Sequence, residues 1–171
     1  MKRIGFGQVE PNHLSAQRTA QIYAQLPAHK KAGDEDTVAS IEVLENGQFV
    51  KYDYANGEVN FTGEGEWMLV FNEVKLYDGW RETYKDYAMQ AKNFTNGVMT
   101  PRVFKTNIGD IFTTNTLGDG SADVAVEVGD ILCPNEKGYL VVNADGEMAW
   151  QVVKVYTLAD GQEAVKIMRI K

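Results

Sequence analysis

The sequence predicts a mainly β fold: a small β-barrel or β-sandwich body preceded by an extended N-terminal arm. Seven of the 16 glycines directly follow Asn or Asp, and these dipeptides favour the positive φ angles of tight hairpin turns. Short runs rich in Val, Ile, Tyr, Phe and Thr lie between the turns, as in sandwiches and barrels. We therefore divide the chain into an arm, 1–37, and a β body, 38–171, with 38–98 and 99–171 as a finer division into two β subdomains.

The arm is distinguished by its pattern and its charge. Residues 15–26 alternate between apolar and polar positions, which favours an extended strand, although a helical spacing at Leu14, Arg18, Ile22 and Leu26 is also present. Residues 1–32 carry five Lys or Arg and one acid, whereas the rest carries 12 and 23. This opposition predicts that the arm docks on an acidic surface, either the body of this protein or a copy of it.

The body is expected to consist of ten short strands. The runs are 40–44, 48–54, 58–61, 66–74, 102–105, 110–114, 123–128, 139–143, 149–158 and 163–170. A two-residue turn at Asn46-Gly47 would pair Val43 with Val50. The stretch 67–71 is apolar on both faces and predicts a central strand, and the last two runs predict a closing hairpin around Asp160-Gly161.

A short motif occurs twice, twenty residues apart. Ile108-Gly109-Asp110-Ile111 is followed by Val128-Gly129-Asp130-Ile131. We interpret the motif as a turn that leads into a strand, in which Gly allows a tight entry and Asp binds nearby backbone amides.

Aromatic residues between 67 and 87 allow two interpretations. Trp80, Tyr84, Tyr87 and Ala88 lie at helical spacing, which fits a short amphipathic helix or a long loop with its aromatic side chains in the core. The alternative is a carbohydrate-binding or other ligand-binding module, whose aromatic platform would be formed by Trp67, Tyr77, Trp80, Tyr84 and Tyr87.

Composition disfavours several classes of function. The single cysteine, Cys133, cannot pair within the chain, and the only histidines are His13 and His29. No spacing for a metal site, nucleophile elbow or phosphate-binding loop is present, so we expect no enzyme, no cofactor and no metal. The longest apolar run, 67–71, is far below the ~20 residues of a membrane span. The sparse basic residues also disfavour nucleic acid as a partner.

Residues 1–18, MKRIGFGQVEPNHLSAQR, and their continuation QIYAQLP at 21–27 carry a resemblance. They resemble the opening of structural proteins encoded among the virion genes of tailed bacteriophages. The body, with QFVKYDY at 48–54 and the paired Gly-Asp-Ile units, is similar to capsid decoration, or cement, proteins.

The resemblance implies a non-enzymatic protein of the virion capsid, assembled in the host cytoplasm. Such proteins clamp the lattice of the major capsid protein through an N-terminal arm and a compact β domain, and they often form trimers. The expected partners are therefore the major capsid protein and copies of this chain. The candidate contact residues combine charge or apolar area on the arm: Arg3, Phe6, Arg18, Ile22 and Tyr23.

Overall fold

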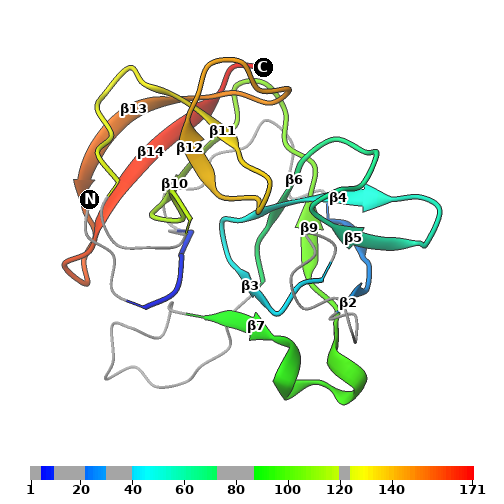
Figure 1. Cartoon of the computed structure of the whole chain (residues 1–171). Coiled ribbons are helices and arrows are strands. Elements are labelled where there is room, and N and C mark those ends of the chain that lie inside the picture. Colours follow the sequence, from blue (N-terminus) through cyan, green and yellow to red (C-terminus); the bar gives the residue numbers. More distant parts are fainter. Residues whose placement is uncertain (1–4, 10–21, 30–39, 73–86, 120–123) are drawn as a thin grey trace.

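The computed structural model describes residues 5–9, 22–29, 40–72, 87–119 and 124–171 and shows the predicted mainly β fold (Figure 1). It contains two five-stranded sheets and two two-stranded sheets, and every strand pairing is antiparallel. The strands are β1 Ile22–Gln25, β2 Ala28–His29, β3 Val43–Glu45, β4 Phe49–Asp53, β5 Glu58–Asn60, β6 Met68–Val70, β7 Ala88–Gln90, β8 Val98–Met99, β9 Arg102–Phe104, β10 Ile111–Thr114, β11 Ile131–Pro134, β12 Leu140–Val142, β13 Trp150–Thr157 and β14 Glu163–Arg169. Two 3₁₀ turns, η3 Ala91–Asn93 and η4 Thr95–Gly97, separate β7 from β8.

The first sheet has the order β1-β9-β6-β4-β5, and its two faces contribute to two different apolar clusters. Its central strand, β6, sends Leu69 into one apolar cluster and Met68 and Val70 into another. This confirms the central strand predicted from the apolar run 67–71. Asn56-Gly57, one of the seven turn dipeptides counted in the sequence, lies in the turn of the β4–β5 hairpin, with Asp53 opposite Glu58.

The second sheet has the order β10-β14-β13-β11-β12. The predicted closing hairpin forms its centre, since β13 and β14 pair from Trp150 opposite Arg169 to Thr157 opposite Glu163. The register shifts between Val152 and Lys154, which marks a β-bulge at Val153.

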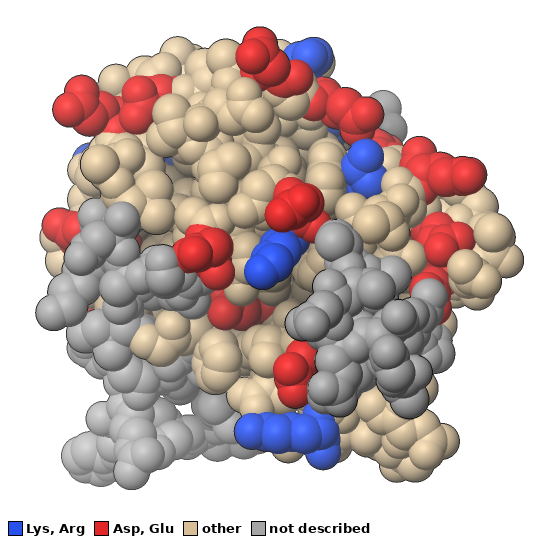
Figure 2. Space-filling model, in the orientation of Figure 1, with Lys and Arg blue, Asp and Glu red and all other residues tan. Residues whose placement is uncertain are grey.

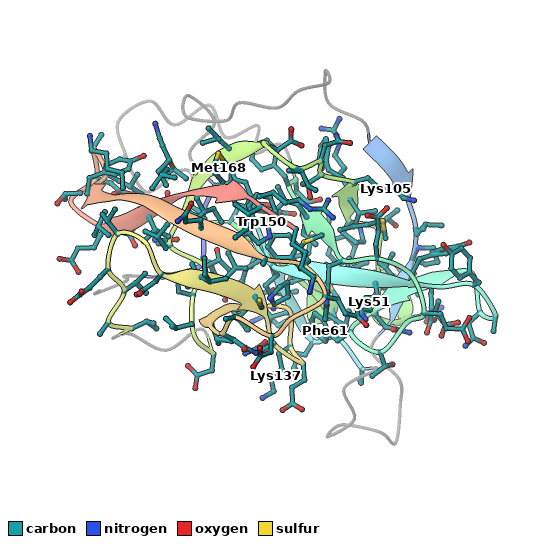
Figure 3. The ribbon with its side chains drawn as sticks, turned by 90° about the horizontal axis from the view of Figure 1, so that it is seen from above. Lys51, Phe61, Lys105, Lys137, Trp150 and Met168 are labelled. Atoms are coloured by element: carbon teal, nitrogen blue, oxygen red, sulfur yellow. The ribbon has the colours of Figure 1, made fainter. Side chains whose placement is uncertain are left out.

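One apolar core joins the two sheets. Phe49 from the first sheet packs against Phe112 and Trp150 from the second, with ring centroids 6.4 and 5.7 Å away. Phe112 and Trp150 are themselves 4.9 Å apart in an edge-to-face arrangement. Trp150, the first residue of β13, is fully buried and lies near the centre of the molecule (Figure 3). The two sheets therefore cover each other in one folded body.

The Gly-Asp-Ile repeat forms the same structure twice, as interpreted from the sequence. Asp110 accepts a hydrogen bond from the Asn107 backbone N–H at 2.7 Å, and Asp130 accepts one from the Glu127 backbone N–H at 2.8 Å. Gly109 and Gly129 have φ angles of 93° and 100°, which favour glycine. Each turn then leads into a strand of the second sheet.

The described parts of the N-terminal arm are extended and lie on the body of the same chain. β1 forms the edge of the first sheet beside β9, β2 pairs with β8, and Val9 bridges to Thr114 at the edge of the second sheet. For residues 22–25, this confirms the strand interpretation of the alternating pattern over the helical one.

The predicted pairing around Asn46-Gly47 was wrong. The turn itself is present, because the Gln48 N–H donates to Glu45 O at 3.3 Å. However, β3 pairs with β7, whereas β4 pairs with β5 and β6. The reason is a bond to a distant loop: Asn46 Oδ1 accepts the Asn72 backbone N–H at 2.7 Å, and this contact makes the turn a corner between sheets.

Two other local predictions were also wrong. Residues 124–127 of the strand expected at 123–128 form no regular structure, and the strand instead begins at Ile131. The helical spacing at Tyr87 and Ala88 does not give a helix, since Ala88 begins β7. In addition, β9 belongs to the first sheet, so the change of sheet falls between Phe104 and Ile111.

Candidate interaction site

The five candidate contact residues occupy different parts of the fold. Arg3 and Arg18 lie outside the described residues. Ile22 and Tyr23 are on β1, where Ile22 stands opposite Phe104 of the first sheet. Phe6 is half-buried and precedes the segment that binds the second sheet. The three described candidates are therefore divided between the two sheets.

Residues 7–9 are fixed by hydrogen bonds on both sides. The Gly7 N–H donates to Glu45 Oε2 and the Gln8 N–H to Asn115 Oδ1, both at 2.8 Å. Thr114 Oγ1 donates to the Gln8 carbonyl at 2.6 Å. Buried backbone groups require such partners, so this part of the N-terminal segment is integral to the body.

Glu45 is the charged group at the centre of this attachment. It is only 4% exposed, yet its carboxylate accepts the Gly7 N–H and the Tyr139 hydroxyl, the latter at 3.3 Å. These bonds compensate for burial of the charge. The contact joins the N-terminal segment to the loop before β12, which explains Glu45 without a catalytic role.

The described carboxyl groups with shifted pKa values serve local structure. The pKa of Asp53 is lowered, first by a hydrogen bond from the Asn56 side chain and then by the Asn56 backbone N–H. The pKa of Glu147 is lowered mainly by its hydrogen bond from Lys51, at 2.9 Å. Both shifts favour the charged form and stabilise surface loops, rather than the proton uptake expected of a general acid.

In Figure 2, acidic side chains lie along the upper rim and the sides of this face and also near its centre, with isolated Lys or Arg between them. This distribution agrees with the excess of acids after residue 32. A basic segment from the same chain or from a partner would meet opposite charge on this face.

The predicted aromatic platform loses a central member. Trp67 is 8% exposed and belongs to the core shared by the two sheets, with Lys51 Nζ 4.9 Å from its ring centre. Tyr87 is half-buried, whereas Tyr77, Trp80 and Tyr84 fall outside the described residues. Trp67 is therefore a core residue, and its ring is not open to stack on a ligand.

The described residues contain no group of three or more His, Cys, Asp or Glu side chains that could hold a metal ion. Cys133 is buried, and its Sγ donates to the Asn143 carbonyl at 3.0 Å. No helix in the described part of the chain is long and apolar enough to cross a membrane.

Several exposed aliphatic side chains were missed as candidates from the sequence. Ile108 and Val128 are 61% and 66% exposed, at the same position of the two Gly-Asp turns. Their place in the repeated motif was the available signal, although a repeat alone does not reveal exposure.

Comparison with known proteins found no matching family model, no matching curated protein and no matching solved structure.

Proposed function

We propose that the protein is a non-enzymatic structural component of a tailed-phage virion. It binds the lattice of the major capsid protein and stabilises the shell, and it reaches the virion by assembly in the host cytoplasm. Because a lattice offers many equivalent sites, each contact can be modest while the assembled shell is strongly stabilised.

The N-terminal sequence carries this proposal. Residues 1–27 resemble the opening of phage virion proteins, and residues 1–32 have a charge opposite to that of the remaining chain. Two observations on the fold support a role in contact. The mainly β body is one that decoration proteins share, and Glu45 and Cys133 have structural partners rather than open sites.

The fold also refines how the N-terminal segment would act. Val9 is bound to β10 and Ile22 to β9, so both flanks of residues 10–21 are fixed to the body. Arg18 lies between these fixed points. We therefore expect the two flanks of this stretch to be ordered before binding, so that attachment costs less ordering than it would for a free arm.

Sedimentation with empty capsid shells tests the proposal. The shells are assembled from the major capsid protein encoded in the same genome, mixed with the full chain and pelleted through a sucrose cushion. The wild-type chain should pellet with the shells and saturate them. Failure of the wild-type chain to co-sediment, at concentrations up to about 100 times those of the shell subunits, would overturn the proposal.

Charge reversal identifies the contact. The double variant Arg3→Glu, Arg18→Glu should reduce the bound amount by roughly tenfold, because each change replaces a favourable contact with an acidic surface by repulsion between like charges. The double variant Lys92→Glu, Lys137→Glu is the charge-matched control, since both side chains are exposed and both residues lie outside the basic segment 1–32. Equal loss in the control would show a general charge effect and contradict the assigned contact.

A further inference from the structure

The two Gly-Asp turns are related by a local two-fold axis in the second sheet. Gly109 N–H donates to Arg169 O at 2.8 Å, and Arg169 N–H returns a bond to Asp110 O at 2.9 Å. In the other turn, Gly129 N–H donates to Val152 O and Val152 N–H to Asp130 O, both at 2.9 Å. Each of the two hydrogen bonds in one turn therefore has an equivalent in the other turn.

The strand register places the axis. Ile111 pairs with Met168, Met168 with Gln151, and Gln151 with Ile131, so these four residues form one row across the sheet. Exchanging β14 for β13 moves Met168 onto Gln151 and Ile111 onto Ile131. The axis therefore passes between Gln151 and Met168, and Figure 3 looks onto this sheet from above.

This row lies on the outer face of the sheet. Each residue of the row has a strand neighbour that faces the buried core: Phe112, Leu132, Trp150 or Ile167. Because neighbouring residues of a strand point to opposite faces, the row itself points outward. Ile170 follows Met168 by two positions and is 38% exposed, and its two-fold equivalent is Val153, which is 36% exposed. The bulge at Val153 allows both Val153 and Lys154 to be exposed.

Each end of the face carries the same chemistry. One end has Ile108 and Ile170, and the other has Val128 and Val153, so each end presents two exposed β-branched side chains. An exposed lysine follows each strand residue of these pairs, at the equivalent positions 171 and 154; Lys171 Nζ donates to the Gly146 carbonyl at 2.9 Å, whereas Lys154 Nζ lies near the Tyr156 ring. The surface thus repeats an aliphatic pair with an adjacent positive charge.

Two like charges meet on this face. Lys154 stands directly opposite Lys166 in the register of β13 and β14, and like charges in this position destabilise a sheet. Lys154 Nζ lies 5.2 Å from the Tyr156 ring centre, and no ion pair joins either lysine to another described residue. A carboxylate from a partner would relieve this repulsion.

We propose that the outer face of the second sheet binds two copies of one element of the capsid protein, related by a two-fold axis of the lattice. The element carries a carboxylate next to an apolar side chain, which complements the lysine and the aliphatic pair at each end. The inference rests on the proposed lattice function and adds the surface, the chemistry of the contact and its stoichiometry of one chain per two capsid subunits.

The shell-binding assay provides the test, with Val128→Asp and Ile108→Asp as the variants. Each variant should weaken binding by roughly tenfold or more, and the two losses should agree within about threefold, because the ends are equivalent. Val142→Asp is the matched control. Val142 is 53% exposed but pairs with the core-facing Leu132, so it lies on the other side of the sheet.

Quantitative mass spectrometry of saturated shells measures the stoichiometry, and circular dichroism verifies that each variant is folded. If Val128→Asp does not fold, Val128→Ser replaces it. If the wild-type chain binds the shells and both aspartate variants bind equally well, this inference is overturned and the lattice proposal stays intact. The same holds if the wild-type chain saturates the shells at one chain per capsid subunit. Absence of wild-type binding would overturn both.

Discussion

At the scale of single residues, Gly7 is required by close approach rather than by its backbone angles. A Cβ at this position would lie 2.7 Å from Glu45 Oε2 and 2.9 Å from Thr116 Cβ, inside the normal contact limit. Gly7→Ala should therefore lower the free energy of unfolding by about 1–3 kcal/mol, and Gly7→Val by more. Urea unfolding followed by tryptophan fluorescence measures the change.

Ala55→Val is the control for added volume, since Ala55 is exposed in the β4–β5 loop. It should change the free energy of unfolding by less than about 0.5 kcal/mol. Equal stability of Gly7→Ala and the wild-type protein would show that the N-terminal segment can move away from Glu45 without loss.

Asp53 gives a prediction about pH. Hydrogen bonds from Asn56 stabilise its charged form and lower its pKa, so the stabilisation is complete above the ordinary Asp value of about 4. It is lost as the pH falls through the lowered pKa, because protonation weakens these bonds. Asn56→Ala should raise the pKa of Asp53 and should destabilise the protein more at pH 7 than at pH 2.

Carbon NMR of the Asp53 carboxyl group measures this pKa, and urea unfolding at the two pH values measures the stability. Asn93→Ala makes the same substitution at another exposed position and should leave the pKa of Asp53 unchanged. An identical pKa in the wild-type protein and Asn56→Ala would refute the assignment of the shift to Asn56.

At the scale of elements, the two Gly-Asp turns have the same hydrogen bonds but different surroundings. Asp110 is 5% exposed and also acts on Arg169, whose pKa is lowered by burial and raised by nearby Glu66 and Asp110. Asp110→Ala should cost about 1–3 kcal/mol, because it leaves the partly buried Asn107 N–H without its carboxylate acceptor and removes a negative charge near Arg169. Asp130→Ala, at the half-buried turn, should cost about 0.5–1.5 kcal/mol.

Asparagine at either position tests the mechanism, since its side-chain oxygen can still accept the turn N–H. Asp130→Asn should recover most of the stability, and Asp110→Asn should recover only part because the negative charge near Arg169 is lost. Thermal unfolding gives the ranking. A larger loss for Asp130→Ala than for Asp110→Ala would contradict it.

The elements that the sequence predicted correctly are those determined by local chemistry. The closing hairpin and the β4–β5 hairpin follow from turn dipeptides between β-branched runs. The pairing of β3 could not be predicted in this way, because the partner of Asn46 is Asn72, 26 residues away. The exposure of Ile108 and Val128 could not be predicted from the sequence either, since it depends on which side chains the folded sheet leaves uncovered.

At the scale of the whole molecule, the sequence distinguished an arm from a body by charge, but long-range pairing determines how they meet. Ala28 is fully buried and Val9 is 3% exposed, so short stretches of the N-terminal segment contribute to both apolar clusters. Apolar residues at alternating positions indicated a strand, whereas its partner strand could not be inferred from the pattern. The candidate contacts at Arg3 and Arg18 remain predictions.

The shared core predicts that the two sheets unfold together. Phe49 belongs to the first sheet but packs against Phe112 and Trp150 of the second, and it is completely buried. Phe49→Ala should lower the free energy of unfolding by about 3–5 kcal/mol, because it removes a large side chain from the contact between the sheets.

Circular dichroism reports both sheets, and tryptophan fluorescence reports chiefly the core around Trp67 and Trp150. In the wild-type protein the two signals should give one coincident urea transition, as expected when neither sheet retains its core alone. Tyr54→Phe, on an exposed loop, keeps the ring contact with Tyr52 and should preserve both the midpoint and the coincidence. Two separate wild-type transitions would instead establish independent subdomains and would restrict the effect of Phe49→Ala to their interface.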